Sequence, residues 1–321
     1  MRALRFHRTG DPSVLTVDEV PPPRPPAGDE LLVGVRASSV NGTDLGLRRG
    51  ELRVATLGRL PFVPGFDLSG QVLACGPQVT AFVPGDRVMA LLGHGGGGAT
   101  EQVLLRQSRA ARVPDALSDE QAAALPLAGL TALQALYGAG RLWGRRRPAR
   151  VLVLGAAGGI GAYAVQLARL AGAHVTGTAR AAQHDFVRGL GVDELLDHRT
   201  QDIAALGQRW DLILDSPGLH SLDRLRPALT DDGVLVSTRP LSLDALRGLA
   251  PRQLRRPGPH LAAVMTSARS QDLTHLAALV RTGRLVVPLD SALPLERAAE
   301  AHRRAEGEAA GKVVLQVTAA T

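Results

Sequence analysis

The sequence is poor in cysteine and in aromatic residues. Its 321 residues include one cysteine, five Phe, two Trp and two Tyr. The lone Cys75 excludes an internal disulfide and a cysteine-rich zinc site, because each of these needs more than one thiol. A chain without disulfides is typical of a reducing compartment, so we predict a cytoplasmic location. The first ten residues agree, because they carry three arginines and no apolar stretch follows them as in a signal peptide.

Lysine is almost absent as well. Lys312 is the only lysine among 37 basic side chains, and the net charge is +7 at pH 7. The arginines are spread along the chain, with one tight cluster at 145–150, so the charge does not predict a nucleic-acid interface. The two most apolar windows, 122–140 and 151–173, are interrupted by Pro, Gly, Gln or Arg and predict no membrane span.

The first hundred residues carry short strand patterns separated by turns rich in Pro and Gly. Strands of this length and spacing predict a small β-barrel. The expected strands are Arg2–His7, Val14–Val20, Glu30–Ser39, Ser69–Ala74 and Arg87–Leu92.

From about Ser118 the pattern changes to alternating helices and strands. Ser118 precedes Asp119 and Glu120, which is typical of a helix start, and predicts a helix toward Leu136. Six apolar strands follow, separated mostly by helical segments, which predicts a parallel sheet with helices on both faces. We therefore expect an α/β protein in which residues 1–118 and 271–321 form one domain and residues 119–270 form the other. The six expected strands are Val151–Leu154, His174–Thr178, Glu194–Asp197, Asp211–Asp215, Gly233–Thr238 and His260–Thr266.

A glycine-rich turn follows the first strand of this second domain. The segment Val151–Gly161 reads VLVLGAAGGIG, a buried strand that leads into a turn and then a helix. Glycine is needed where the backbone turns sharply or approaches a pyrophosphate, and the N–H groups at the helix start attract phosphate. The strand, turn and helix context predicts dinucleotide binding rather than a merely structural turn.

The end of the next strand discriminates between the two nicotinamide cofactors. An acidic residue there would bind the free ribose hydroxyl, whereas this chain has Arg180, with His184 four residues later. Arginine can bind a phosphate through two hydrogen bonds, and Arg199 after the following strand adds charge. We therefore favour NADP(H) over NAD(H), although Arg180 could also be an ordinary surface arginine.

Several motifs in this order resemble the medium-chain dehydrogenase/reductase superfamily, nearest to its zinc-free NADPH:quinone oxidoreductase branch, which includes zeta-crystallin. The resemblance covers nearly the whole chain. It implies a GroES-like β-barrel catalytic domain and a Rossmann doubly wound parallel sheet, with NADPH in the cleft. The motifs that carry it are Ala37–Asp44, Leu60–Gly70, Val83–Val88, Leu130–Leu136, the glycine-rich turn and Gly311–Leu315.

The resemblance also implies site residues. Asn41 and Thr131 would lie beside the nicotinamide and are the candidate catalytic residues. A homodimer is expected by the same resemblance, formed through the strand that ends at Thr266. The implied cofactor-binding residues are Asn41, Thr131, Gly155, Ala157, Gly158, Gly159, Ile160, Arg180, His184, Arg199, Ser216, Gly218, Met265 and Lys312.

We expect no metal site. The zinc alcohol dehydrogenases of the superfamily have Gly-His-Glu where this chain has Gly65–Asp67, and they add a lobe with four cysteines. His94, in a glycine-rich loop, is more simply a loop residue than a ligand. The short-chain dehydrogenases are excluded too, since they need a tyrosine and a lysine four residues apart, a pair that this sequence lacks.

Without a Lewis acid, reduction of a conjugated acceptor is easier than oxidation of an alcohol. We therefore expect hydride transfer from NADPH to a quinone or an α,β-unsaturated carbonyl compound. Many relatives carry a tyrosine after the Asn-Asp motif, whereas 45–60 holds none, so no general acid is identified. Arginines in 48–59 leave an enoyl-thioester reductase open as an alternative. A non-catalytic NADPH-binding, crystallin-like protein with RNA affinity is the other alternative.

Overall fold

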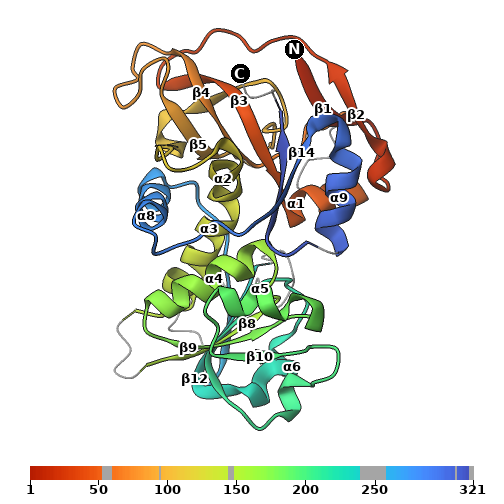
Figure 1. Ribbon diagram of the computed structural model, residues 1–321, viewed down its shortest axis with the longest axis vertical. Helices are drawn as coiled ribbons and strands as arrows, with labels where there is room; N and C mark the ends of the chain where they lie inside the picture. The colour runs from red at the N-terminus through yellow and green to blue at the C-terminus, as the bar shows by residue number, and fades with distance from the viewer. Residues whose placement is uncertain (53–59, 94, 144–147, 239–257, 308, 318–321) are drawn as a thin grey trace. The chain divides into compact units, whose positions relative to one another are not determined.

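The protein contains two compact units. The computed structural model describes residues 1–52, 60–93, 95–143, 148–238, 258–307 and 309–317 (Figure 1). No helix in these described ranges is long and apolar enough to span a bilayer. The first unit consists of Met1–Ala128, Ala268–Gly283 and Val287–Thr321, and the second of Gly129–Ser267 and Arg284–Val286.

The first unit is built on a seven-stranded sheet. The central strand β3 alternates between buried and partly exposed positions over most of its length, as a strand with one face on a core should. Strand β15, from the end of the chain, pairs antiparallel with β3 and so joins both chain ends in one sheet. The strands run in the order β14 (Leu289–Pro294), β15 (Lys312–Gln316), β3 (Glu30–Val40), β4 (Asp67–Cys75), β5 (Arg87–Leu91) and β7 (Ala110–Arg112), with β6 (Gln102–Arg106) also paired to β3.

A separate hairpin and several short helices complete this unit. Strands β1 (Arg2–Phe6) and β2 (Leu15–Glu19) pair antiparallel. Figure 1 shows helix α9 close to β14, and both elements contribute to the core of this unit. The helices are α1 (Gly42–Arg49), α2 (Asp119–Ala124), α8 (Ser270–Arg281) and α9 (Ala298–Gly307).

The helix predicted from Ser118 to Leu136 is divided into three segments. Ser118 caps α2 as expected, because its side chain accepts a hydrogen bond from the Gln121 N–H at 3.2 Å. Pro126 then starts α3, since proline has no N–H to continue the preceding helix. The segments are α2, α3 (Pro126–Leu133) and a π-helical turn, η4 (Gln134–Ala139).

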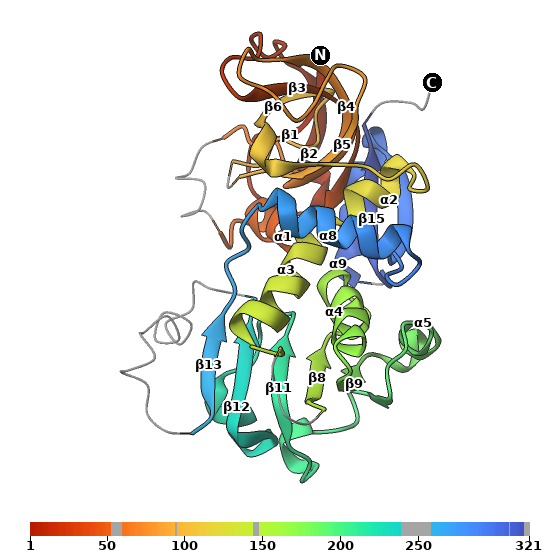
Figure 2. The ribbon, with the colours of Figure 1, turned by 90° about the vertical axis from the view of Figure 1, so that its left-hand side faces the viewer.

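The second unit contains the predicted parallel sheet of six strands. Its central strand β8 is buried on both faces, which explains the uninterrupted apolar run at its centre. Figure 2 shows β8, β11, β12 and β13 side by side. The order is β10 (Glu194–Leu196), β9 (His174–Thr178), β8 (Arg150–Leu154), β11 (Trp210–Asp215), β12 (Leu229–Ser237) and β13 (His260–Ala263).

Two helices of this unit each begin after a strand and a short turn. Helix α4 (Gly159–Leu170) begins after the glycine-rich turn, and α5 (His184–Gly189) begins after a 3-10 turn, η5 (Ala181–Gln183). Both helices therefore start beyond the carboxyl end of a parallel strand, the edge at which open α/β sheets bind ligands. The GroES-like and Rossmann classes expected from the sequence are confirmed.

Candidate functional site

The glycine-rich turn has the backbone that a pyrophosphate needs. Gly155 has φ of +69°, a left-handed conformation that favours glycine. A Cβ atom on Gly161 would lie 2.1 Å from the Gly155 carbonyl oxygen, so only glycine allows the start of α4 to approach the turn so closely. Helix α4 begins at Gly159, and its first N–H groups have no carbonyl partner within the helix. The turn therefore fits a bound dinucleotide.

The remaining residues of this turn support its shape. Gly158 is the N-cap of α4, and its N–H donates to the Gly155 carbonyl oxygen at 3.0 Å. Ala157 is buried, and Ile160 lies in the first turn of α4. All these residues thus lie where the strand β8 passes into the helix.

The loops after β9 and β10 bring the predicted phosphate-binding residues into neighbouring segments. Arg180 precedes η5, and its Nε donates to Oε1 of Gln183 at 3.4 Å. His184 starts α5, and its Nε2 lies 3.4 Å from the Ala179 carbonyl oxygen. Arg199 follows β10 and is exposed. Because β9 and β10 are parallel neighbours, these three side chains lie at one edge of the sheet.

Asp197 is a carboxylate at this edge that the sequence reasoning missed. Its Oδ1 accepts the Arg199 N–H at 2.9 Å. This bond lowers the pKa of Asp197, and the Ala181 N–H and the nearby His198 and His184 act in the same direction. Asp197 thus connects the loops that follow β9 and β10. Its position at the end of a predicted strand was the sequence feature that could have identified it as a site residue.

Thr131 helps to hold the segment that follows β13. Its Oγ1 lies 2.7 Å from Oγ1 of Thr266, and Gln134 forms two hydrogen bonds with the backbone of Ser267. Thr131 is 4% exposed, whereas Met265 is 58% exposed. Helix α3 and the turn η4 therefore fix the backbone around Met265.

Ser216 and Gly218 lie in the loop after β11. The Ser216 Oγ donates to the Leu154 carbonyl oxygen at 2.7 Å, which joins the ends of β11 and β8. Gly218 has φ of +67°, and its N–H donates to Oδ1 of the buried Asp215 at 3.1 Å. Asp215 also accepts the His220 N–H at 2.7 Å, so this loop is held by one buried carboxylate.

Two of the predicted cofactor-binding residues, Asn41 and Lys312, lie in the first unit, and their side chains are in contact. Asn41 is the N-cap of α1, and Lys312 is the first residue of β15. The Lys312 Nζ donates to Oδ1 of Asn41 and, at 3.1 Å, to the Val40 carbonyl oxygen. The Asn41 Nδ2 donates to the Ser39 carbonyl oxygen at 3.1 Å. Both ends of the Asn41 amide are therefore held within this cluster.

Two buried carboxyl groups complete the cluster. Asp67 accepts hydrogen bonds from the Ser39 Oγ at 2.7 Å and from the Leu127 N–H at 3.3 Å. Asp44 accepts the Asn41 N–H at 2.9 Å. Burial raises the pKa of both groups, that of Asp44 to about 7, and burial also lowers the pKa of Lys312. Sequence reasoning did not assign these two carboxyl groups to the site, although both lie within the quoted motifs.

The segment that aligns with a zinc-ligand motif has a different chemistry in this chain. Phe66 occupies the position of the histidine, is 6% exposed, and its ring lies 6.5 Å from that of Phe62. No group of three His, Cys, Asp or Glu side chains suited to a metal ion occurs among the residues that the structure describes. His94 lies outside the described residues.

Comparisons with known proteins agree with this architecture. Residues 27–115 match the alcohol dehydrogenase GroES-like domain, and residues 190–315 match the zinc-binding dehydrogenase family. The chloroplast envelope quinone oxidoreductase homolog of Arabidopsis thaliana is 34% identical, with 98% of each chain covered. The mitochondrial NAD(P)H oxidoreductase RTN4IP1 of Bos taurus is 30% identical over 90% of this chain and 82% of its own. A segment of erythronolide synthase EryA2 of Saccharopolyspora erythraea is 38% identical over 71% of this chain and 6% of the synthase.

Solved structures show the same fold. The quinone oxidoreductase of Coxiella burnetii matches with a TM-score of 0.89 at 29% identity, covering 99% of both chains. A mycobacterial protein in complex with NADPH matches with a TM-score of 0.81 at 27% identity, covering 98% of this chain and all of that chain. The chain belongs to the medium-chain dehydrogenase/reductase family. It is an NAD(P)H-dependent oxidoreductase related to the quinone oxidoreductases of that family.

The predicted cytoplasmic location is wrong by these comparisons. Four of the relatives that the comparisons found are named as chloroplast or mitochondrial proteins. The prediction used the lone Cys75 and the lack of a signal peptide for secretion. A chain that forms no internal disulfide can function in any compartment, so cysteine content does not discriminate between the cytoplasm and an organelle.

Proposed function

We propose that this protein transfers hydride from NADPH to a quinone or an α,β-unsaturated carbonyl compound without using zinc. The observation that carries the proposal is the glycine turn at the start of α4, combined with Arg180 after β9 where an NAD-binding protein has an acidic residue. Arg180, His184 and Arg199 would contact the 2′-phosphate. The N–H groups of Gly159 and Ile160 would contact the pyrophosphate, with Gly155, Ala157 and Gly158 shaping the turn beside it.

The other cofactor contacts are proposed from the positions of the residues within the second unit. Thr131 and Met265 lie on segments that hydrogen bonds hold together, and Ser216 and Gly218 lie in the loop held by Asp215. In this proposal they line the nicotinamide half of the cofactor site. NADPH supplies the hydride when bound, and the residues of this chain orient the cofactor and the acceptor.

Asn41 would act through the charged Lys312 side chain that it binds, because both ends of its own amide already form hydrogen bonds. Its Oδ1 accepts from Lys312 and its Nδ2 donates to Ser39, so the cluster presents a buried ammonium group beside the start of α1. Positive charge and helix N–H groups stabilise an oxygen that becomes negative when hydride adds to a conjugated acceptor. We propose that Asn41 and Lys312 contribute in this way, and we assign no proton donor.

The residues at the zinc-motif position support zinc independence. Phe66 offers no ligand atom, and Asp67 is engaged by Ser39 and Leu127. The test is the metal content of the purified protein together with its activity before and after treatment with a chelator. Stoichiometric zinc with loss of activity on chelation would refute this part of the proposal.

Cofactor preference is tested by titrating the protein with NADPH and NADH. We expect NADPH to bind more tightly, and Arg180→Ala to weaken NADPH binding roughly tenfold to a hundredfold with little effect on NADH. Arg209→Ala is the matched control, because Arg209 is exposed and precedes β11 at the opposite end of the sheet. An equal loss of affinity for NADPH and for NADH in the Arg180 variant would contradict a role at the 2′-phosphate.

The acceptor is tested by following NADPH oxidation with a soluble quinone, a cyclic enone and a simple ketone. The proposal expects turnover with the quinone or enone, and at least a hundredfold lower kcat/KM with the isolated ketone, about 3 kcal/mol of transition-state stabilisation. Preference for the ketone, or for an alcohol with NADP⁺, would refute it.

An enoyl-thioester reductase is the second candidate. The 38% identity to a segment of erythronolide synthase EryA2 favours it. The arginines in 48–59, which suggested an anionic substrate, support the enoyl-thioester reductase less. Arg48 is buried and paired with Glu306, and Arg49 contacts Glu51 and Glu306. Arg53 and Arg59 lie outside the described residues. A crotonyl thioester in the same assay decides between the two, because only the second candidate expects it to be the best acceptor.

We also propose that the protein forms a homodimer. Strand β13 is an edge of the parallel sheet, and an edge strand presents unpaired backbone groups that another strand can cover. Light scattering coupled to size-exclusion chromatography measures the mass directly. A monomer at micromolar concentration would refute the proposal.

A further inference from the structure

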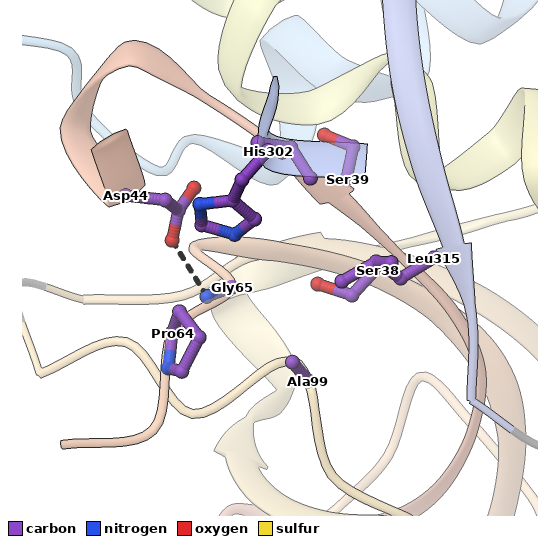
Figure 3. Close-up of a pocket in the computed structure, with 9 residues that line it drawn as sticks. Ser38, Ser39, Asp44, Pro64, Gly65, Ala99, His302 and Leu315 are labelled. Carbon is purple, nitrogen blue, oxygen red and sulfur yellow. Dashed lines mark hydrogen bonds between the residues drawn. The ribbon is translucent and has the colours of Figure 1, made fainter. Parts of the chain in front are cut away.

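Two histidines have a buried ring nitrogen that forms no hydrogen bond among the described residues, His220 and His302. A buried polar atom without a partner is costly, so each ring needs an explanation. Figure 3 shows His302 in the small pocket that it lines with Asp44, where no carboxylate of the described residues comes within ion-pair distance of the ring. His220 differs, because its Nδ1 lies 3.3 Å from Oδ1 of Asp215 in the second unit.

Asp215 is a fully buried carboxyl group at the end of β11. Its Oδ1 accepts the Gly218 N–H at 3.1 Å, and its Oδ2 accepts the His220 N–H at 2.7 Å. Backbone N–H groups that donate to a carboxyl group favour its charged form. A buried carboxylate also needs a basic partner, and among the described residues His220 is the only basic side chain within ion-pair distance of Asp215.

The proton between these two groups belongs to the imidazole of His220. Without it, the Nδ1 lone pair would face a carboxylate oxygen at 3.3 Å, and two hydrogen-bond acceptors at that distance repel each other. Nδ1 is buried, so solvent does not satisfy it, and the exposed 25% of the side chain lies on its other atoms. An Nδ1–H group instead attracts the carboxylate, and this attraction persists although the contact lacks the angle of a hydrogen bond.

We propose that His220 carries a proton on Nδ1, directed at the Asp215 carboxylate, and that this pair holds the loop 216–220 in the shape that binds the cofactor. His220 is then a positioning residue, because it acts through Asp215 and the loop rather than by touching the reacting atoms. No sequence motif pointed to it, since the imidazole returns to the strand end only through the fold of the loop.

The loop is anchored at both ends in this arrangement. At its start, the Ser216 Oγ donates to the Leu154 carbonyl oxygen at 2.7 Å. At its end, His220 lies one residue before Ser221, the N-cap of α6 (Leu222–Leu225). The pair therefore fixes the part of the loop that Ser216 does not reach.

The effect on cofactor binding rests on the proposed function, in which Ser216 and Gly218 contact the cofactor. Strand β11 pairs with β8 where the strand order of the sheet reverses, the place at which open α/β sheets bind ligands. A loop that is already ordered loses less conformational freedom when the ligand binds. The residues proposed for the 2′-phosphate follow β9 and β10 instead. The pair should therefore strengthen the binding of NADPH and NADH alike.

Nitrogen NMR of the full-length protein labelled at its nine histidines tests the pair directly. The His220 signals are assigned by their loss in His220→Asn. We expect a proton on Nδ1 at pH 8, where an unpaired imidazole is neutral and has no such preference for Nδ1. A neutral His220 ring with an unprotonated Nδ1 at this pH would overturn the proposal.

Cofactor titration provides the second readout. His220→Phe keeps a ring but removes both nitrogens, and it should raise the Kd of NADPH and of NADH by the same factor, about tenfold. The kcat at saturating cofactor should change by less than about twofold, because the bound cofactor itself then orders the loop. His220→Asn should restore part of the affinity, since its amide can donate to Asp215. Exchange of the Gly218 amide should be faster in His220→Phe than in the wild-type protein.

The matched control is His174→Phe. His174 lies 3.8 Å from Glu194 and starts β9, so it belongs to a histidine and carboxylate pair at the opposite edge of the same sheet. Both Kd values should be unchanged in this variant. An equal loss of affinity in His174→Phe would show that the effect is not specific to the loop, and would count against the proposal.

The outcomes separate this inference from the proposed function. A wild-type protein that binds neither NADPH nor NADH would refute the proposed function, and the NMR result would still decide whether the pair exists. Unchanged affinity for both cofactors in a folded His220→Phe variant would refute the positioning role. A loss of affinity for NADPH alone would also refute it, because it would place His220 at the 2′-phosphate. If His220→Phe does not fold, His220→Asn and the wild-type NMR signals decide the question.

Discussion

Replacing Asp44 with asparagine should change how the stability of the protein depends on pH. Burial raises the pKa of Asp44 from 3.8 to about 7 in the folded protein. Between these values the folded state keeps the proton that the unfolded state has released. The stabilisation from this group is therefore complete below pH 3.8, falls as the pH rises, and is lost above about 7.

The size of the effect follows from this interval. At about 1.4 kcal/mol per pH unit, the wild-type protein should lose up to about 4 kcal/mol from this group between pH 4 and pH 8. Asp44→Asn does not titrate, so its free energy of unfolding relative to wild type should rise by up to about that amount over the same range. The difference between the two proteins isolates Asp44 from all other titrating groups.

The assay must report on the first unit. Both tryptophans and both tyrosines, at 143, 210, 137 and 163, lie in the second unit, so their fluorescence does not follow the unfolding of the unit that contains Asp44. Urea unfolding by circular dichroism at pH 4.5, 6 and 8 is suitable, with exchange of the β15 amides as a local probe.

A second variant has a different pH dependence and serves as a control. The hydrogen bond from Arg112 lowers the pKa of Asp86, so the stability from Asp86 is present above its unfolded pKa and is lost as the pH falls. The stability difference for Asp86→Asn should therefore stay constant between pH 5 and pH 8. A constant difference for Asp44→Asn over the same range would refute the raised pKa and the reasoning built on it.

Two further predictions concern the glycine turn and the buried lysine. Gly161→Ala should destabilise the second unit by about 1–3 kcal/mol and weaken NADPH binding, because its Cβ would lie 2.1 Å from the Gly155 carbonyl oxygen. Urea unfolding followed by fluorescence measures the change in stability. Gly189→Ala is the control, since nothing lies within 4 Å of its Cβ, and equal stability of the two variants would contradict the close packing at Gly161. Lys312→Met should destabilise the first unit by about 3–5 kcal/mol near pH 7, because it leaves the Asp67 carboxylate buried without its cation. Urea unfolding followed by circular dichroism measures this loss. An unchanged free energy of unfolding would show that the ammonium group of Lys312 does not balance the buried carboxyl groups.

Patterns that are local in sequence predicted most of the parallel sheet. Strand β8, the glycine turn and α4 follow one another directly, so the apolar run and the glycines specify them without help from distant residues. The strands β6 and β7 were not predicted, because short runs with few alternating residues become strands only by pairing with β3 and β5. The last strand of the sheet was predicted to reach Thr266, but β13 ends at Ala263, since its pairing with β12 stops there.

The sequence by itself determined the family, the two kinds of domain and the dinucleotide turn, because each depends on motifs in which neighbouring residues act together. Only the tertiary structure decided what the buried charges of the first unit contact. Asn41 meets Lys312 across segments from opposite ends of the chain, and Asp44 and His302 line the same small pocket. Sequence spacing carries no information on such pairs, since the antiparallel pairing of β15 with β3 and the packing around α9 bring them together. The proton states of these groups follow from their burial, which exists only in the folded protein.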